Sequence, residues 1–183
     1  GERVLIVGGG VIGLTALSCI RARPAACHVT IALRHRYQEE LALDRGADHV
    51  ILWSRSVGDA RRYDDIATRV GGRRIPAAFG NQMLLGGYDV VYDCIGTGRS
   101  LTDAMKFTRA RGTVVELGTC QISVVDTTPL WLSEVTVLGS YGRQMEQVDG
   151  PPRHTYGLVF DLIAPGRLRT DGLLTHTFAL REY

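Results

Sequence analysis

Short apolar runs alternate with longer amphipathic stretches along most of this 183-residue chain. Apolar runs rich in β-branched residues are typical of strands that are buried on both faces of a parallel sheet. The stretches between them place apolar residues at helical spacing, and in the first of these Ile12, Ala16 and Ile20 share one helix face. The alternation predicts βαβ units and a doubly wound α/β fold, in which helices cover both faces of a parallel sheet.

The same pattern sets the expected boundaries of the elements. Pro24 is expected to end the first helix, and Gly46 to close the second as a C-cap. The segment from Ser54 to Gly87 has one predicted helix followed by glycine pairs, and it is expected to be a loop-rich excursion with no assigned role. Strands are predicted over residues 3–7, 29–33, 49–52, 88–94, 113–117, 136–140 and 174–180, and helices over residues 10–23, 37–45, 59–70, 101–110 and 156–163.

A glycine-rich turn joins the first predicted strand to the first predicted helix. Its spacing, Gly8-x-Gly10-x-x-Gly13, is the fingerprint of a dinucleotide-binding Rossmann fold. The first glycine makes the tight turn, the second lets the backbone approach a pyrophosphate, and the third lets the helix pack close to the strand. The N–H groups at the start of the helix, around Val11 and Ile12, would then face the phosphates. A structural strand-to-helix turn can share this spacing, but the strand before it and the helix after it favour a dinucleotide site.

The end of the second predicted strand indicates which dinucleotide is bound. NAD sites carry an acidic residue about 20 positions after the last glycine, where it accepts hydrogen bonds from the ribose. Here that position is Leu33, which cannot accept them, and Arg34 and Arg36 follow it. Guanidinium groups bind phosphate through charge-assisted hydrogen bonds, so the sequence predicts NADP, with its 2′-phosphate, as the cofactor and leaves NAD as the second choice.

Charge and composition exclude several classes of function. The net charge is +2, with 21 basic and 19 acidic residues, and no long basic run predicts a nucleic-acid partner. No apolar run of about 18 residues predicts a membrane span, and the N-terminus lacks an export signal, so a cytoplasmic protein is expected. The four cysteines form no C-x-x-C pair and the five histidines show no ligand spacing. We therefore expect no metal site and no catalytic side chain in these residues.

Several segments in this order resemble the cofactor-binding domain of the medium-chain dehydrogenase/reductase superfamily, the zinc-type alcohol dehydrogenases. The ordered set spans nearly the whole chain, and its specificity comes from the set more than from any one motif. The matching segments are residues 4–13, 44–51 (DRGADHVI), 88–96 (YDVVYDCIG), 112–118 (GTVVELG) and 137–142 (LGSYG after Val137).

The resemblance implies which residues lie beside the nicotinamide half of the cofactor. Gly96 would lie by the nicotinamide ribose, and the backbone around a second set of residues would contact the ring and its carboxamide. That set is Val115, Leu117, Gly118, Ser140 and Tyr141. Packing in the core is the alternative role for the apolar members.

The resemblance also implies a missing partner domain. In this family the catalytic zinc, its ligands and the proton relay lie mainly on a separate catalytic domain. We therefore expect residues 1–183 to be an isolated cofactor-binding domain excised from a longer NAD(P)-dependent dehydrogenase, with residues 176–183 crossing back toward the absent domain. Such a domain would bind cofactor and catalyse little alone. The parent would transfer hydride between nicotinamide and an alcohol or carbonyl.

Other functions remain open at this point. A zinc-free quinone or enoyl reductase of the same superfamily and a non-catalytic dinucleotide-sensing module both fit the lack of catalytic residues. A methyltransferase is disfavoured because Val7 and Leu33 stand where an acidic residue would hold its ligand. The family often dimerises by pairing edge strands of the cofactor domains, which makes Ile122 to Ser140 the candidate surface for a homodimer.

Overall fold

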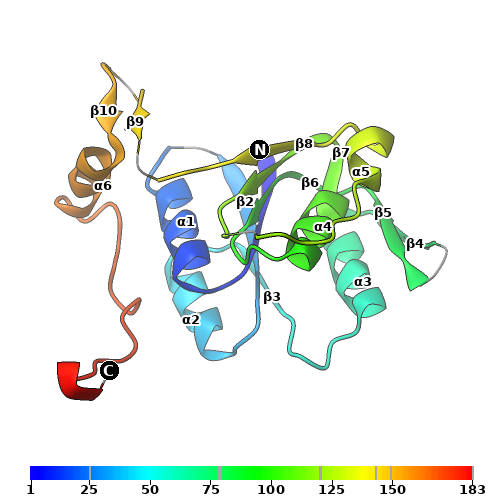
Figure 1. The fold of residues 1–183 in the computed structure, drawn as a ribbon, viewed down its shortest axis with the longest axis horizontal. Coiled ribbons are helices and arrows are strands. Elements are labelled where there is room, and N and C mark those ends of the chain that lie inside the picture. The colour runs from blue at the N-terminus through cyan, green and yellow to red at the C-terminus, as the bar shows by residue number, and fades with distance from the viewer. Residues whose placement is uncertain (25, 78–79, 120, 143, 149, 183) are drawn as a thin grey trace.

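The computed structural model describes residues 1–24, 26–77, 80–119, 121–142, 144–148 and 150–182. A six-stranded sheet with the order β3-β2-β1-β6-β7-β8 forms its centre, and every strand pair in it is parallel. The chain winds outward in one direction from β1 and then in the other from β6, which confirms the predicted doubly wound fold (Figure 1). The strands are β1 (Glu2–Val7), β2 (Cys27–Leu33), β3 (His49–Leu52), β6 (Tyr88–Asp93), β7 (Thr108–Glu116) and β8 (Thr136–Gly139).

The central strand β1 is buried on both faces. It pairs with β2 and β6, so that Val4 lies opposite Val29 on one side and Val90 on the other. Its last four residues, 4–7, are each at most 5% exposed. Burial on both faces explains why this strand is a continuous apolar run and not an alternation of apolar and polar residues.

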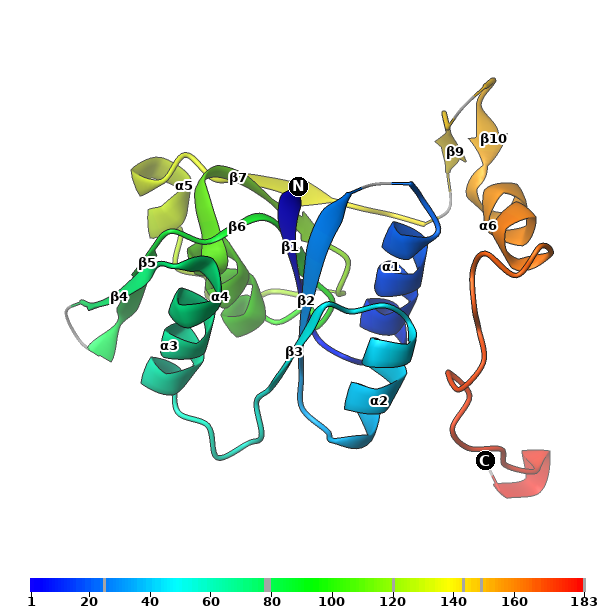
Figure 2. The same cartoon turned by 180° about the vertical axis from the view of Figure 1, so that it is seen from behind.

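Two pairs of helices cover the sheet. Helices α1 (Val11–Arg21) and α2 (Tyr37–Asp44) pack on one face, while α3 (Asp59–Val70) and α4 (Gly98–Phe107) pack on the other (Figures 1 and 2). Each pair buries its own apolar cluster against the sheet. Phe107 anchors the second cluster, with its ring centroid 4.9 Å from that of Tyr63.

The boundaries of α4 and β7 differ from the prediction. The helix was expected over residues 101–110, but it begins at Gly98 because Thr97 forms a capping box with Ser100. The Ser100 backbone N–H donates to Thr97 Oγ1 over 3.0 Å, and the Thr97 N–H donates to Ser100 Oγ over 2.9 Å. The helix ends three residues early, and β7 starts at Thr108, five residues before the predicted strand, because Thr108 pairs with Tyr88.

The excursion after α3 contains a hairpin that the sequence analysis missed. Strands β4 (Arg73–Pro76) and β5 (Gln82–Leu85) pair antiparallel and pack against α3. Leu84 is buried in the cluster beneath α3 and α4. The expectation of a loop-rich segment was therefore wrong here, since the segment forms a hairpin whose Leu84 belongs to the core.

The C-terminal part of the chain lies beside the α1–α2 layer (Figures 1 and 2). The predicted strand over residues 174–180 is wrong, because residues 173–179 form no strand in the described structure and Leu174 and Phe178 are about three-quarters exposed. Before it, Leu168 is buried and Arg169 pairs with Asp44 over 2.9 Å, which fixes the tail to α2. The remaining elements are α5 (Thr128–Leu132), β9 (Met145–Glu146), β10 (Arg153–His154), α6 (Thr155–Ile163) and the 3-10 turn η2 (Leu180–Glu182).

Candidate functional site

The three spaced glycines form a tight turn between β1 and α1. Gly8 has φ +111°, a backbone conformation that side chains rarely adopt. A Cβ on Gly13 would lie 1.8 Å from the Gly8 carbonyl oxygen, so the third glycine is required for the helix to pack against the turn. A Cβ on Gly10 would meet nothing within 4 Å. The turn is therefore packed tightly at its first and third glycines and open at its second.

The N-terminus of α1 points its free backbone groups toward this opening. Gly10 is the N-cap residue, and no side chain caps the helix there. Val11 and Ile12 are 57% and 47% exposed, although both are apolar. Uncapped N–H groups at the positive end of a helix dipole form a favourable anion site.

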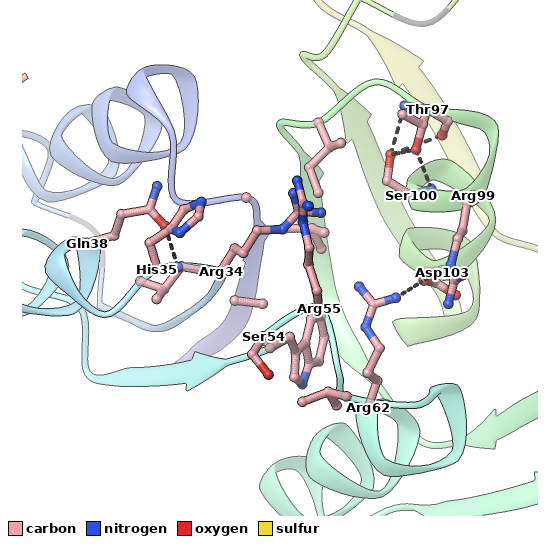
Figure 3. Close-up of a pocket in the computed structure, with 17 residues that line it drawn as sticks. Arg34, His35, Gln38, Ser54, Arg55, Arg62, Thr97, Arg99, Ser100 and Asp103 are labelled. Carbon is pink, nitrogen blue, oxygen red and sulfur yellow. Dashed lines mark hydrogen bonds and ion pairs between the residues drawn. The ribbon is translucent and has the colours of Figure 1, made fainter.

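A cavity of about 530 Å³ opens beside this turn (Figure 3). Its walls come from the carboxyl ends of β1, β2 and β3 and from the N-terminus of α4, so it lies at the edge of the sheet where ligands bind in open α/β folds. Gly8, Leu33 and Arg34, three of the predicted site residues, line it. Trp53 and Ile95 provide apolar wall, as expected for a pocket that holds a planar ring.

Gln38 fixes the wall that follows β2. Its side chain is buried, and Oε1 accepts a hydrogen bond from the backbone N–H of His35 over 3.1 Å. A Cβ on Gly9 would lie 2.5 Å from the Leu33 Cβ, so the glycine turn and the end of β2 are in close contact. Gln38 and Gly9 thus hold the β2–α2 turn against the glycine turn.

Two arginines in the cavity have no partner of opposite charge. Arg34 follows β2 and Arg55 follows β3, and neither side chain makes a hydrogen bond or an ion pair within the described residues. Figure 3 shows both side chains extending from these turns into the cavity. Arg36, which was predicted to act with Arg34, is exposed and does not line the cavity.

Sequence reasoning missed Arg55, although a signal for it exists. The carboxyl ends of parallel strands meet at one edge of a sheet, so a residue three positions after β3 can reach the same cavity as a residue just after β2. Ser54 and Arg55 stand directly after the predicted strand 49–52 and its neighbour Trp53. Thr97 and Ser100 were missed as well, because α4 was placed too late in the chain.

The other two arginines of the cavity are neutralised. Arg62 lies 4.6 Å from the centroid of the Trp53 ring and pairs with Asp103 over 3.1 Å. Arg99 pairs with Asp59 and approaches Asp103 to 4.0 Å. Burial raises the pKa of Asp103 even though these guanidinium groups act in the opposite direction. This side of the cavity is therefore balanced, and the positive charge is concentrated at Arg34 and Arg55.

The ends of β6 and β7 form a second tight junction. A Cβ on Gly118 would lie 2.2 Å from the Gly96 nitrogen, and Gly96 has φ +78°. Asp93 organises both loops: Oδ1 accepts from the N–H of Ile95 over 2.9 Å, and its carbonyl oxygen accepts from the N–H groups of Leu117 and Gly118 over 2.9 Å each. Gly96 and Gly118 are therefore adjacent at the ends of β6 and β7.

Glu116 faces Asp93 across this junction. The two residues are directly paired in the register of β6 and β7. Asp93 Oδ2 and both carboxyl oxygens of Glu116 are buried, and no donor reaches them within the described residues. Burial, together with the facing Asp93 carboxyl, raises the pKa of Glu116 to about 7. Glu116 can therefore hold a proton near neutral pH.

The remaining predicted contact residues lie along the same edge. Val115 and Leu117 are half-buried at the end of β7. Ser140 and Tyr141 are exposed just after β8, where the Ser140 N–H donates to the Glu116 carbonyl over 3.1 Å. The structure brings these residues and Gly118 to one end of the sheet, away from the Arg34 side.

The described residues contain no cluster of three or more His, Cys, Asp or Glu side chains that could hold a metal ion. Cys120 lies outside the described residues. In the part of the chain that the structure describes, no helix has both the length and the apolar character needed to cross a membrane.

Comparison with known protein families shows which family this chain belongs to. A family model described as zinc-binding dehydrogenase matches residues 11–163. The chain belongs to the zinc-binding dehydrogenase family. This confirms the resemblance to the cofactor-binding part of zinc-type medium-chain dehydrogenases that the ordered motifs indicated.

Relatives of this family match the chain from end to end but are more than twice as long. L-idonate 5-dehydrogenase of Vitis vinifera is 27% identical over 98% of this chain and 43% of its own length. L-threonine 3-dehydrogenase of Legionella pneumophila is 29% identical over 100% of this chain and 46% of its own length. The chain thus spans less than half the length of these curated relatives.

A solved relative shares the fold. A Sinorhizobium meliloti protein described as a zinc-binding dehydrogenase, with NADP bound, is 26% identical and superimposes with a TM-score of 0.66. The match covers 93% of this chain and 44% of that one.

Proposed function

We propose that this chain is the cofactor-binding domain of an NADP-dependent oxidoreductase of the zinc-type alcohol or polyol dehydrogenases. One observation carries the proposal: Gly8 of the glycine turn lines the cavity that holds the unpaired charges of Arg34 and Arg55. Gly10, the open position of the same turn, lines a neighbouring hollow next to α2. The membership of the family and the NADP in the Sinorhizobium meliloti relative support it.

Different residues along the carboxyl ends of the strands would bind different parts of the cofactor. The backbone at Gly10, Val11, Ile12 and Gly13 would bind the pyrophosphate, because it presents N–H groups with no competing side chain. Leu33 would lie beside the adenosine ribose, where an acidic residue would repel a 2′-phosphate.

The nicotinamide half would lie at the other end of that edge. Gly96 and Gly118 would lie by the ribose, and the backbone of the neighbouring residues would contact the ring and its carboxamide. Bound NADP supplies a hydride donor or acceptor at the nicotinamide ring. The backbone set is Val115, Leu117, Ser140 and Tyr141.

We further propose that the domain works within a longer chain. The relatives extend well beyond the match, and no ligand set for zinc forms in the described residues. Zinc, where the parent uses it, would be held by another domain together with the alcohol or carbonyl substrate. Cytoplasmic location and homodimerisation near Ile122 to Ser140 belong to the same proposal.

Two alternatives keep the cofactor but change the role. A zinc-free quinone or enoyl reductase would share this domain, and so would a non-catalytic dinucleotide sensor. The idonate, threonine and sorbitol dehydrogenases among the relatives favour the zinc-type enzyme.

Titration of the 183-residue chain with NADPH and with NADH, followed by calorimetry, tests the cofactor assignment. We expect both to bind and NADPH to bind more tightly. Equal affinity would refute the choice of NADP, and failure of both to bind would refute the dinucleotide site.

A further inference from the structure

We propose that Arg55, in the turn after β3, is the second cation that recognises the 2′-phosphate, and that it forms a two-arginine clamp with Arg34. The inference rests on the proposed function, because it needs a dinucleotide in the cavity. It replaces the pair Arg34 and Arg36, which the sequence predicts, with a pair that comes from two different turns.

The first argument is the placement of the three arginines. Arg34 and Arg55 both line the cavity, from the turns after β2 and β3. Arg36 stands two residues beyond Arg34, at the N-cap of α2, and lies outside the cavity lining, although all three arginines are exposed. Neighbouring strands β2 and β3 are paired in register to their last residues, Leu33 with Leu52, so their following turns start side by side.

The second argument is charge. The cavity is lined by four arginines. Two of them are already paired with nearby carboxylates, Arg62 with Asp103 and Arg99 with Asp59. No carboxylate within the described residues pairs with Arg34 or Arg55. Two guanidinium groups that share a cavity repel each other unless an anion lies between them. A phosphate dianion satisfies both, because each guanidinium can donate two parallel hydrogen bonds.

The third argument is the neighbourhood of Arg55. It directly follows Trp53 and Ser54, and all three line the cavity. The indole of Trp53 is 7% exposed and is held by a hydrogen bond from Nε1 to Asp65 and by the guanidinium of Arg62. The base of the Arg55 turn is therefore fixed, while its side chain remains extended into the cavity (Figure 3).

Adenosine 2′,5′-bisphosphate and 5′-AMP provide the sharpest test, because they differ only in the 2′-phosphate. Their binding to the 183-residue chain is measured by calorimetry for the wild type, Arg55→Ala, Arg34→Ala and Arg55→Lys. We expect Arg55→Ala and Arg34→Ala each to weaken bisphosphate binding about 10-fold to 100-fold, while 5′-AMP binding changes by less than about 2-fold. Arg55→Lys should recover part of the loss, since it keeps the charge but not the paired hydrogen bonds.

Two further variants control for charge and for the competing residue. Arg23→Ala removes an exposed arginine at the far end of α1 and should leave both affinities unchanged. In Arg36→Ala the preference for the bisphosphate should persist. Circular dichroism of each variant confirms that the fold is retained.

The outcomes separate this inference from the proposed function. If Arg55→Ala keeps the full preference for the bisphosphate, or if Arg36→Ala removes it, the Arg34–Arg55 clamp is wrong while the dinucleotide site stands. If the wild type binds neither nucleotide, both the clamp and the proposed function are overturned.

Discussion

A methyl group added to Gly13 would lie 1.8 Å from the carbonyl oxygen of Gly8, whereas one added to Gly10 would have open space around it. The first contact is with backbone and cannot be relieved by a side-chain rotation. The glycine turn therefore combines a packing requirement at Gly13 with an open position at Gly10, where we propose that the pyrophosphate binds.

This difference predicts opposite effects for two alanine substitutions. Gly13→Ala should lower the free energy of unfolding by about 2–4 kcal/mol, because the helix must move away from the strand. Gly10→Ala should change it by no more than about 1 kcal/mol, since φ at Gly10 is −77°. Only Gly10→Ala should abolish NADPH binding in a protein of nearly normal stability. Urea unfolding and NADPH titration measure both effects, and tight binding by Gly10→Ala would contradict the pyrophosphate placement.

Lys106 provides a prediction about the hairpin. Its side chain is 2% exposed, and Nζ lies 2.7 Å from Asp126 Oδ2 and 2.5 Å from Asn81 Oδ1. Lys106→Met should lower the free energy of unfolding by about 2–3 kcal/mol. This loss is smaller than that expected on breaking a wholly buried ion pair, because Asp126 is partly exposed. NADPH affinity should not change, because this ion pair lies away from the cavity lining.

The same ion pair predicts acid sensitivity. The Lys106 ammonium holds the pKa of Asp126 well below its usual range. A lowered carboxyl pKa contributes stability that is present above the unfolded value near 3.8 and is lost as the pH falls below it. Urea midpoints at pH 6 and pH 3 should therefore differ more in the wild type than in Lys106→Met. Parallel losses in the two proteins would show that other carboxyl groups dominate.

Glu116 predicts the opposite pH dependence. Its pKa is raised from 4.5 to about 7, so the folded protein keeps a proton that the unfolded chain releases between these values. This contribution is complete below pH 4.5 and is lost as the pH rises through 7. In Glu116→Gln the new amide can donate a hydrogen bond to Asp93. At pH 8 this variant should have a free energy of unfolding about 1–2 kcal/mol higher than the wild type. This figure is reduced to allow for solvent screening near the partly exposed Glu116.

At pH 4.5 most of the advantage of Glu116→Gln should disappear, because wild-type Glu116 is then protonated in the folded state and half protonated in the unfolded chain. Thermal unfolding at the two pH values measures the difference. An advantage of equal size at both pH values would mean that the proton held by Glu116 is not its cause.

The exposed edge of the sheet predicts the oligomeric state. Strand β8 pairs only with β7 among the described strands, and all four of its residues are exposed, with Leu138 at 51%. If dimers form through this edge, Leu138→Lys should convert the dimer to monomer, because paired copies would place the two charges close together. Sedimentation velocity measures the mass, and a wild type that stays monomeric at high concentration would contradict the dimer.

Regular patterns allowed most of the fold to be predicted. Strand β3 and helix α3 have the predicted bounds, and β1 differs by a single residue, because long periodic or wholly apolar runs leave few alternatives. The start of α4 was missed because it depends on a hydrogen-bonded exchange between Thr97 and Ser100. The strand predicted over 174–180 failed because an apolar alternation forms a strand only beside a partner strand.

The candidate site was predictable where local sequence creates it and not where distant turns converge. The tight turn at Gly8 and Gly13 and the open position at Gly10 follow from the spacing of the three glycines. Predicting a role for Arg55 would have required knowing that its turn lies beside that of Arg34. Predicting the raised pKa of Glu116 would have required knowing that the strand register places it opposite Asp93. Both relationships join residues that are far apart in the sequence, and no local sequence pattern indicates them.

The β4–β5 hairpin joins α3 to β6 and so enters the sheet at the amino ends of its strands, opposite the edge that carries the cavity. Changes in the length of this connection would leave the cavity unaltered, since β6 is held in register by its neighbours β1 and β7. A fluorescent or affinity peptide grafted onto this connection would accordingly lie far from the cavity.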